Sequence, residues 1–391
     1  MGCPQAMMSS VVGLATACFV MTMTMSSALA ASSNVRPAAK QVPAMYVFGD
    51  STVDVGNNNY LPGDFPRADK PYYGVDFPGG ARPTGRWSNG YNIADFVAKS
   101  MGFKRSPPAY LSLTRASRSR RLLILRGLGG VSYASAGSGI LDSTHAGKYI
   151  PLRKQVRYFG ATRAGMVATL GATAANDLLS KSLFLISTGS NDVGVFAAAA
   201  AQQQQQFPLP SDVVDAYYSS LISNYSAAIT ELYGMGARRF GIVNAALLGC
   251  TPSARALSPA GACAAGLNAL AGGFNGALGS LLAGLPRRLR GLRCSLGDLG
   301  GLMQAATVDP PRAPDGGPWN VDSACCGAGR LGAQGGCQPN STLCVDRGRY
   351  LFWDSSGHPT QRAAQLVASA LYDGPPEFTA PVNLKQLTTQ E

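Results

Sequence analysis

Short apolar runs alternate with longer amphipathic stretches along most of the chain. Three continuous apolar runs predict buried strands: 45–48, 183–187 and 239–243. Runs of this length are typical of strands that are covered on both faces, as in a parallel sheet. Helical patterns occupy four longer segments: 91–100, 212–233, 267–285 and 359–371. Strands that alternate with helices predict βαβ units and a doubly wound α/β sheet.

Nothing along the chain separates two independent cores. No linker rich in Pro, Gly or Ser is long enough to do so, and no internal repeat is visible. Ala197–Ala201 followed by Gln202–Gln206 is a low-complexity insertion, which we expect to be an exposed loop or a frayed helix. We therefore expect one large α/β domain with long insertions.

The first 30 residues contain no Lys, Arg, Asp or Glu. An apolar stretch from Val11 to Met25 leads into small residues at 26–31, which is typical of a signal peptide and its cleavage site. A membrane-spanning helix needs about 20 apolar residues, and this stretch is shorter. We expect a signal peptide over 1–30, cleavage near Ala30 and a secreted mature chain over 31–391. An uncleaved anchor and an organelle transit peptide are the alternatives.

Cysteine usage also favours export. Seven cysteines lie beyond the N-terminal segment, all in the C-terminal half: Cys250, Cys263, Cys294, Cys325, Cys326, Cys337 and Cys344. This clustering is typical of disulfides formed in an oxidising compartment. A disulfide between the first two would close a short loop. The adjacent Cys325 and Cys326 are expected to form disulfides with Cys337 and Cys344 rather than with each other, so Cys294 would remain unpaired. A zinc site is disfavoured because the chain has no Cys-x-x-Cys repeat and only two His. Sequons at Asn224 and Asn340 are candidate N-glycosylation sites.

The charge balance indicates an affinity for polyanions. Lys and Arg number 33 and Asp and Glu 21, which gives a formal net charge of +12. Such an excess would attract an acidic wall polysaccharide or an anionic lipid surface. Much of it lies in 115–126, around the apolar run 122–125. The alternative for this segment is a solvated loop beside one buried apolar turn. Nucleic-acid binding has no motif in its support.

Two polar clusters directly follow predicted strands, at 49–52 (GDST) and 189–192 (GSND). Ligands of open α/β sheets bind beyond the carboxyl ends of the strands. Ser51 lies in such a turn, where a hydroxyl can face a cleft. To act as a nucleophile, a serine needs a base such as histidine.

The chain offers two histidines for that task. His358 follows Asp354 by four residues, so this carboxylate could orient its ring. His145 has no comparable context, and we expect it at the surface.

These residues, in this order, resemble the plant GDSL esterase/lipase branch of the SGNH hydrolases, over about 43–371. The blocks that carry the resemblance are 48–58 (FGDSTVDVGNN), 83–90 (PTGRWSNG), 133–139 (YASAGSG), 189–192 (GSND), 236–240 (GARRF), 248–252 (LGCTP) and 325–327 (CCG). Thr52 stands where the name-giving Leu usually is. Ser132 stands where an Asn usually precedes the aromatic residue. The resemblance implies a three-layer α/β/α sandwich with a mainly parallel central sheet, SGNH/flavodoxin-like, whose core spans about 43–372.

The resemblance further implies a secreted serine esterase or lipase that needs no cofactor and no metal. Its substrates would be carboxylic esters of lipids, acetylated polymers or small molecules. Ser51 would attack the ester carbonyl, His358 would take the proton, and Asp354 would hold the imidazole. The backbone N–H groups of Ser51 and Gly137 and the side-chain amide of Asn191 would form the oxyanion hole.

Several of these assignments have alternatives. One extra residue lies between Asp354 and His358 relative to the usual Asp-x-x-His, and Gly357 could absorb it because glycine adopts backbone angles closed to other residues. Gly139 competes with Gly137 as the oxyanion donor, and Asn191 could instead cap its helix. An acyltransferase would use the same residues. An inactive wall- or lipid-binding glycoprotein is the remaining alternative.

Three further residues of the matching blocks are expected to be structural. Asp54 and Asp192 would brace loops. The pair Arg86-Trp87 would anchor its segment rather than contact substrate.

Overall fold

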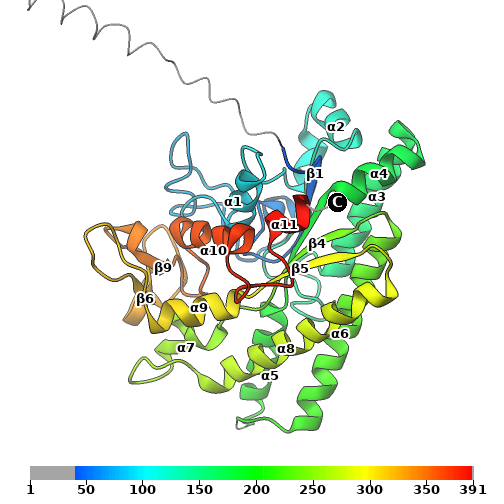
Figure 1. Cartoon of the computed structure of the whole chain (residues 1–391). Coiled ribbons are helices and arrows are strands. Elements are labelled where there is room, and N and C mark those ends of the chain that lie inside the picture. The colour runs from blue at the N-terminus through cyan, green and yellow to red at the C-terminus, as the bar shows by residue number, and fades with distance from the viewer. Residues whose placement is uncertain (1–39, 206, 390–391) are drawn as a thin grey trace, which may run out of the picture. The chain divides into compact units, whose positions relative to one another are not determined.

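The computed structural model describes residues 40–205 and 207–389, so the expected signal peptide lies outside the described residues. A six-stranded sheet in the order β10-β5-β4-β3-β1-β2 forms its centre (Figure 1). Its strands are β1 (Ala44–Gly49), β2 (Gly129–Ser132), β3 (Leu183–Ser187), β4 (Arg239–Val243), β5 (Arg293–Gly297) and β10 (Thr379–Ala380). Neighbours from β2 to β5 pair in parallel, whereas β10 runs antiparallel to β5 at the edge. The predicted mainly parallel sheet is confirmed.

Helices cover both faces of this sheet. They are α1 (Ile93–Ser100), α2 (Arg118–Leu125), α3 (Leu152–Leu170), α4 (Ala172–Lys181), α5 (Ser190–Gln202), α6 (Ser211–Gly234), α7 (Pro252–Ala256), α8 (Ala265–Arg288), α9 (Leu299–Val308), α10 (Gln361–Asp373) and α11 (Leu384–Thr389). Two short pairs of strands lie outside the sheet: β6 (Asn320–Ala324) with β9 (Tyr350–Phe352), and β7 (Cys326–Gly327) with β8 (Thr342–Leu343). In the described part of the chain, no helix is both long and apolar enough to cross a membrane.

Two hydrophobic clusters, one on each side of the sheet, produce the three layers. Tyr46 and Phe48 of β1 pack in one cluster with α3, α6 and α8. Met45 and Val47 of the same strand pack in the other with α1, α10 and α11. Successive side chains of a strand point to opposite faces, so a continuous apolar run buries both faces of β1. The predicted three-layer α/β/α arrangement is confirmed.

The predicted strands and helices all occur, with ends shifted by a few residues. Ala197–Ala201 lies within α5 and forms most of its last turns, as a helix end rather than a loop. The interpretation of 115–126 as a solvated loop beside one buried apolar turn is wrong in its secondary structure, because residues 118–125 form α2. Ile124 alone is buried in this helix. The neighbouring Leu122 and Leu123 are 39% and 50% exposed.

Candidate active site

The turn after β1 presents Ser51 at the carboxyl end of the sheet. Gly49 has a φ of 129°, and a Cβ at this position would lie 1.9 Å from the backbone oxygen of Ser187 on β3. Only glycine allows this close approach. The Asp50 carboxylate accepts hydrogen bonds from the backbone N–H and the hydroxyl of Thr52, at 3.0 and 2.8 Å. These bonds hold the turn around Ser51, whose own hydroxyl forms no hydrogen bond within the described residues.

The Asp50 side chain is 2% exposed. Burial raises the pKa of this carboxyl to about 6, against the hydrogen bonds from Thr52, which lower it. The Asp50 carboxyl therefore loses its proton at a higher pH than an exposed aspartate does.

A second loop, residues 132–139, is tied to the first by buried polar side chains. Asp54 accepts hydrogen bonds from the backbone N–H groups of Gly56, Asn57 and Ala136, at 2.7, 2.9 and 3.0 Å. The amide of Asn58 donates to the carbonyl of Ala136 at 2.9 Å. The predicted bracing role of Asp54 is confirmed, and it fixes the position of the next peptide, that of Gly137.

Gly137 lies in the left-handed region with a φ of 80°. A Cβ here would meet the ring of Tyr149 at 2.3 Å. Gly137 lines the cavity in front of Ser51, whereas Gly139 does not. The geometry therefore favours Gly137 over Gly139 as an oxyanion donor. Ser132, which replaces the usual Asn, leaves its buried hydroxyl without a partner among the described residues.

Asn191 lies in the first turn of α5, beyond the carboxyl end of β3. Gly189 is the N-cap of this helix, and no side chain caps it, so the capping alternative for Asn191 is wrong. The amide of Asn191 donates to the carbonyl of Ser138 at 2.9 Å, which leaves its second N–H for the cavity. Asp192 accepts from the N–H groups of Ile140 and Leu141 and thereby braces the loop, as predicted. Burial raises the pKa of Asp192.

His358 and Asp354 occupy the loop between β9 and α10. Nδ1 of His358 lies 2.7 Å from Oδ2 and 2.8 Å from Oδ1 of Asp354, which is 1% exposed. Gly357 has a φ of 85°, and its N–H donates to the Asp354 carbonyl at 3.0 Å. The extra residue is thus absorbed in a tight turn that a left-handed glycine permits. The two side chains meet although the spacing differs from the usual one.

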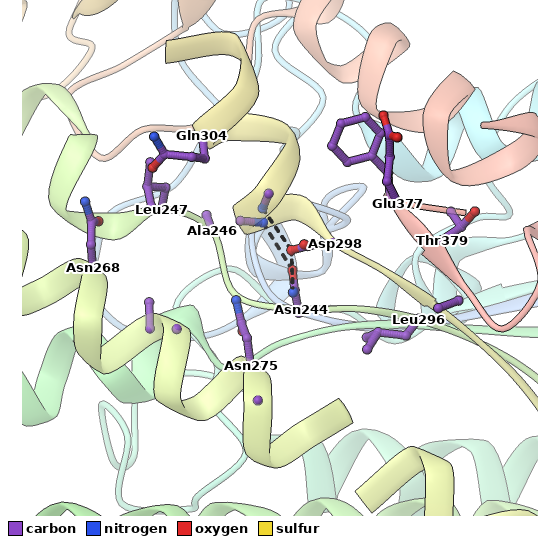
Figure 2. Close-up of a pocket in the computed structure, with 17 residues that line it drawn as sticks. Asn244, Ala246, Leu247, Asn268, Asn275, Leu296, Asp298, Gln304, Glu377 and Thr379 are labelled. Atoms are coloured by element: carbon purple, nitrogen blue, oxygen red, sulfur yellow. Dashed lines mark hydrogen bonds between the residues drawn. The ribbon is translucent and has the colours of Figure 1, made fainter. Parts of the chain in front are cut away.

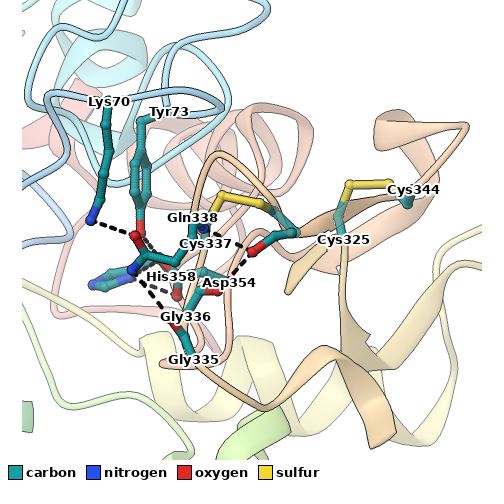
Figure 3. The surroundings of a disulfide bond; sticks show 12 residues. Lys70, Tyr73, Cys325, Gly335, Gly336, Cys337, Gln338, Cys344, Asp354 and His358 are labelled. Atoms are coloured by element: carbon teal, nitrogen blue, oxygen red, sulfur yellow. Dashed lines mark hydrogen bonds and ion pairs between the residues drawn. A yellow bond between two sulfur atoms is a disulfide. The ribbon is translucent and has the colours of Figure 1, made fainter. Parts of the chain in front are cut away.

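A third hydrophobic cluster supports this pair from behind. It contains Tyr73, Trp353 and the buried Cys326 and Cys337. Figure 3 shows the hydroxyl of Tyr73 pointing at Asp354, and this hydrogen bond is 3.0 Å long. Burial, together with the Asp354 carboxylate, raises the pKa of Tyr73 well above its ordinary value, so the hydroxyl keeps its proton and donates.

Trp87 packs against the other side of the imidazole, with 5.0 Å between the ring centroids of Trp87 and His358. It also lines the cavity in front of Ser51. Besides the expected role as an anchor, Trp87 thus supports the imidazole and borders the cavity. The expected anchoring role also holds for Arg86, which forms a buried ion pair with Asp95 at 2.6 Å.

The six paired cysteines form three disulfides: Cys250–Cys263, Cys325–Cys344 and Cys326–Cys337. Cys294 is the free, buried one. Two of the disulfides lie beside the Asp354 loop, as Figure 3 shows, and the backbone N–H of Cys326 donates to the carbonyl of Trp353 at 2.8 Å. The third links the loop at 248–251, which borders the cavity, to the segment before α8.

A cavity of about 280 Å³ brings the predicted residues together. Ser51, Gly137, Asn191 and His358 all line it, although they come from four separate segments of the chain. The expected surface position of His145 is confirmed, and this residue also lines the cavity. His145 is exposed, but its Nδ1 lies 2.8 Å from the Gly137 carbonyl.

A larger cavity of about 510 Å³ adjoins this one, and Ala246 lines both. Its walls come from α8, α9 and the segment at 377–380 (Figure 2). Asn244 and Asp298 are hydrogen-bonded to each other at its floor, at 2.8 Å. No group of three His, Cys, Asp or Glu suited to a metal ion occurs at 40–205 or 207–389.

Sequence reasoning missed Tyr73, Tyr149 and the cavity position of Trp87 and His145. Tyr73 carries no local signal of its role, because its partner Asp354 lies near the other end of the chain. The positive φ of His145, 48°, likewise has no signature in the sequence.

Comparisons with known proteins identify the family of this chain. The family model for GDSL-like lipases and acylhydrolases matches residues 45–371. The GDSL esterase/lipase At5g55050 of Arabidopsis thaliana is 37% identical over 352 residues, which cover 89% of this chain and 90% of that protein. The GDSL esterase/lipase At4g16230 of the same plant is 35% identical over 91% of this chain and 93% of its own length.

An extracellular lipase from Streptomyces rimosus, known from a crystal structure, aligns with 84% of this chain and 99% of its own, at 15% identity and a TM-score of 0.30. The assignment rests on the family model and the plant relatives alone. The chain belongs to the GDSL-like lipase/acylhydrolase family, a family of ester hydrolases.

Proposed function

We propose that the protein is a secreted serine esterase or lipase that cleaves carboxylic esters through an acyl-enzyme on Ser51. The observation that carries the proposal is the shared cavity. A hydroxyl without a hydrogen-bond partner within the described residues, an imidazole held by a buried carboxylate, and two amide groups line one space of about 280 Å³. This set of groups supports acyl transfer, since a candidate nucleophile, a candidate base and candidate oxyanion donors line the same cavity.

The proposed first step is attack of Ser51 Oγ on the ester carbonyl carbon. His358 takes the hydroxyl proton on Nε2, because Nδ1 faces Asp354. The buried carboxylate of Asp354 orients the ring and stabilises its protonated form. When the C–O bond to the alcohol breaks, His358 returns the proton to the leaving oxygen. Water then attacks the acyl-enzyme by the same route and releases the carboxylic acid.

The negative charge on the carbonyl oxygen requires donors during both steps. We assign this task to the backbone N–H groups of Ser51 and Gly137 and to the amide of Asn191. These donors are neutral and are held in place by the bonds of Asp54, Asn58 and Ser138 to their loops. Loss of one such donor typically lowers the rate about 100- to 1000-fold.

Export and processing belong to the same proposal. Residues 1–30 would be removed as a signal peptide, and 31–391 would form the hydrolase domain. Three disulfides support an oxidising compartment such as the cell wall space. Asn224 and Asn340 are both exposed, as N-glycosylation requires. The net charge of +12 supports attraction to an anionic polysaccharide or lipid surface.

The test combines an active-site phosphonate probe with p-nitrophenyl esters of graded chain length. Wild type should be labelled and should turn over esters, whereas Ser51→Ala should lose both. His358→Ala should lower the esterase rate about 1000-fold or more with an unchanged Tm. Ser119→Ala, at an exposed serine, is the matched control. Unlabelled but folded wild type would instead favour an inactive binding glycoprotein, and ester formation with a supplied alcohol would favour an acyltransferase.

A further inference from the structure

We propose that α2 and the basic cavity beside it form a docking surface for an anionic phospholipid bilayer. This surface is defined by Arg105, Arg120, Arg121, Leu123 and Leu128. It shares no lining residue with the catalytic cavity. The inference therefore concerns where the enzyme acts and stands independently of the catalytic proposal.

The segment that contains this surface carries positive charge and no negative charge. Eight Lys and Arg lie between Lys99 and Arg126, and no Asp or Glu occurs between Asp95 and Asp142. In the described part of the chain, none of the arginines from 105 to 126 forms an ion pair or a side-chain hydrogen bond with another residue. Unpaired guanidinium groups are available to an external anion, and they bind phosphate with two parallel hydrogen bonds.

A cavity of about 530 Å³ lies against this helix. Arg82, Arg105 and Arg120 line it, and no Asp or Glu does. The fourth arginine of its wall, Arg86, is already neutralised by the buried Asp95. The cavity therefore has the charge and the size to take a phosphate headgroup.

Exposed apolar side chains gather at the same place. Tyr60, Leu122, Leu123 and Leu128 are 39%, 39%, 50% and 49% exposed. All except Leu122 also line the basic cavity. Figure 1 shows α2 at the periphery of the fold, where it packs against α3 and leaves these leucines exposed. Leucines in this setting gain free energy when they leave water.

The combination of charges and leucines favours a bilayer over other polyanions. Arginines alone would suit an acidic polysaccharide. Such a polymer, however, has no apolar interior into which Leu123 and Leu128 could insert. At a bilayer the guanidinium groups meet lipid phosphates while the leucines enter the boundary of the acyl chains. A basic helix with leucines on its exposed side is typical of proteins that lie on a membrane surface.

The test is co-sedimentation of the exported, purified protein with vesicles. All proteins carry Ser51→Ala, so that the lipid is not consumed whether or not the enzyme is a lipase. Vesicles of phosphatidylcholine mixed with phosphatidylglycerol should bind the protein, and vesicles of phosphatidylcholine alone should bind it weakly. The triple variant Arg105→Gln/Arg120→Gln/Arg121→Gln should lower the partition coefficient about 100-fold. The double variant Leu123→Ser/Leu128→Ser should lower it at least tenfold at unchanged charge.

A control of equal charge separates the surface from the net charge. The variant Arg287→Gln/Arg288→Gln/Arg290→Gln removes three exposed arginines at the end of α8 and should bind vesicles as wild type does. An equal loss in this control would overturn the proposal, as would full binding by the leucine variant or no preference for the anionic lipid. Binding to polygalacturonate that depends on Arg120 but not on Leu123 would assign the surface to polysaccharide instead.

Discussion

The phenolic hydroxyl of Tyr73 donates a hydrogen bond of 3.0 Å to Oδ2 of Asp354, the same oxygen that lies 2.7 Å from Nδ1 of His358. The carboxylate is thus bonded to Tyr73 and His358, which are far apart in the sequence, and Oδ1 also accepts from the backbone N–H of Ser356 at 3.1 Å. Tyr73 is itself packed edge-to-face against Trp87 and Trp353. Tyr73, which does not line the cavity, is therefore in a position to set the orientation of the carboxylate.

Tyr73→Phe should lower kcat about tenfold and leave KM nearly unchanged. The ring would remain packed, but Asp354 would lose one of the bonds that hold it. Without the hydrogen bond from Tyr73, the Asp354 carboxylate would stabilise the protonated imidazole more strongly. The acid limb of the pH profile of kcat should therefore move to higher pH. Tyr91→Phe is the matched control, because its hydroxyl forms no hydrogen bond within the described residues. If Tyr73→Phe lowered the Tm but left the pH profile of kcat unchanged, the role of Tyr73 would be limited to packing.

The disulfide Cys326–Cys337 should be needed for both stability and turnover. Its cysteines lie in the cluster that holds Tyr73 and Trp353, and it closes a loop with a sequence separation of 11. Chain entropy assigns such a loop about 3 kcal/mol of unfolding free energy. The double variant Cys326→Ala/Cys337→Ala should have an unfolding free energy lower by about that amount, measured with guanidinium, and a kcat that is several-fold lower. The free, buried Cys294 provides the control as Cys294→Ala. Wild-type turnover in the double variant would contradict the coupling.

Gly49→Ala should prevent stable folding. The added methyl would lie 1.9 Å from the Ser187 backbone oxygen at a φ of 129°, and neither strand can give way inside the sheet. We expect the free energy of unfolding to fall by more than about 3 kcal/mol. The measurement would show insoluble protein or an unfolding midpoint at a much lower denaturant concentration. Gly284→Ala in α8 is the control, since nothing lies within 4 Å of its added methyl. That change should stabilise the protein by about 0.5–1 kcal/mol, and equal effects at both sites would refute the steric argument.

Asp50→Asn should alter how stability depends on pH. Burial raises the pKa of Asp50 from 3.8 to about 6, so between these values the folded chain keeps a proton that the unfolded chain has released. The unfolding free energy of wild type therefore falls as pH rises through this window, by up to about 3 kcal/mol from this group. Asparagine keeps the acceptor for Thr52 and removes the titration.

The measurement is guanidinium unfolding of wild type and Asp50→Asn from pH 4 to 7. The variant should show a shallower decline, although Asp54, whose pKa burial also raises to about 6, keeps part of it. Asp212→Asn, at an exposed carboxyl, should follow wild type. Parallel curves for wild type and Asp50→Asn would show that Asp50 does not titrate in this range.

The three strands of the central sheet with continuous apolar runs were predictable from the sequence, whereas β2, β5 and β10 were not. The side chains of β1, β3 and β4 alternate between the two faces of the sheet, and almost all of them are buried. Their apolar pattern is therefore local and visible in the sequence. β2 reads Gly-Gly-Val-Ser and β5 Arg-Cys-Ser-Leu-Gly, which carry little strand signal. Their hydrogen bonds to β1 and β4 make them strands. At Gly130 a Cβ would lie 1.9 Å from the Met45 oxygen, so the close pairing itself demands glycine.

The candidate catalytic residues and their order were predictable from sequence: a serine after the first strand, an asparagine after another, and an aspartate and a histidine before the last long helix. Local patterns suffice for this, because turn residues and apolar runs act over a few positions. No local pattern indicated that Tyr73 donates to Asp354, that Trp87 and His145 line the cavity, or that Leu122 and Leu123 remain exposed. These relations join residues from distant segments, and packing of the whole sheet and its helices sets them.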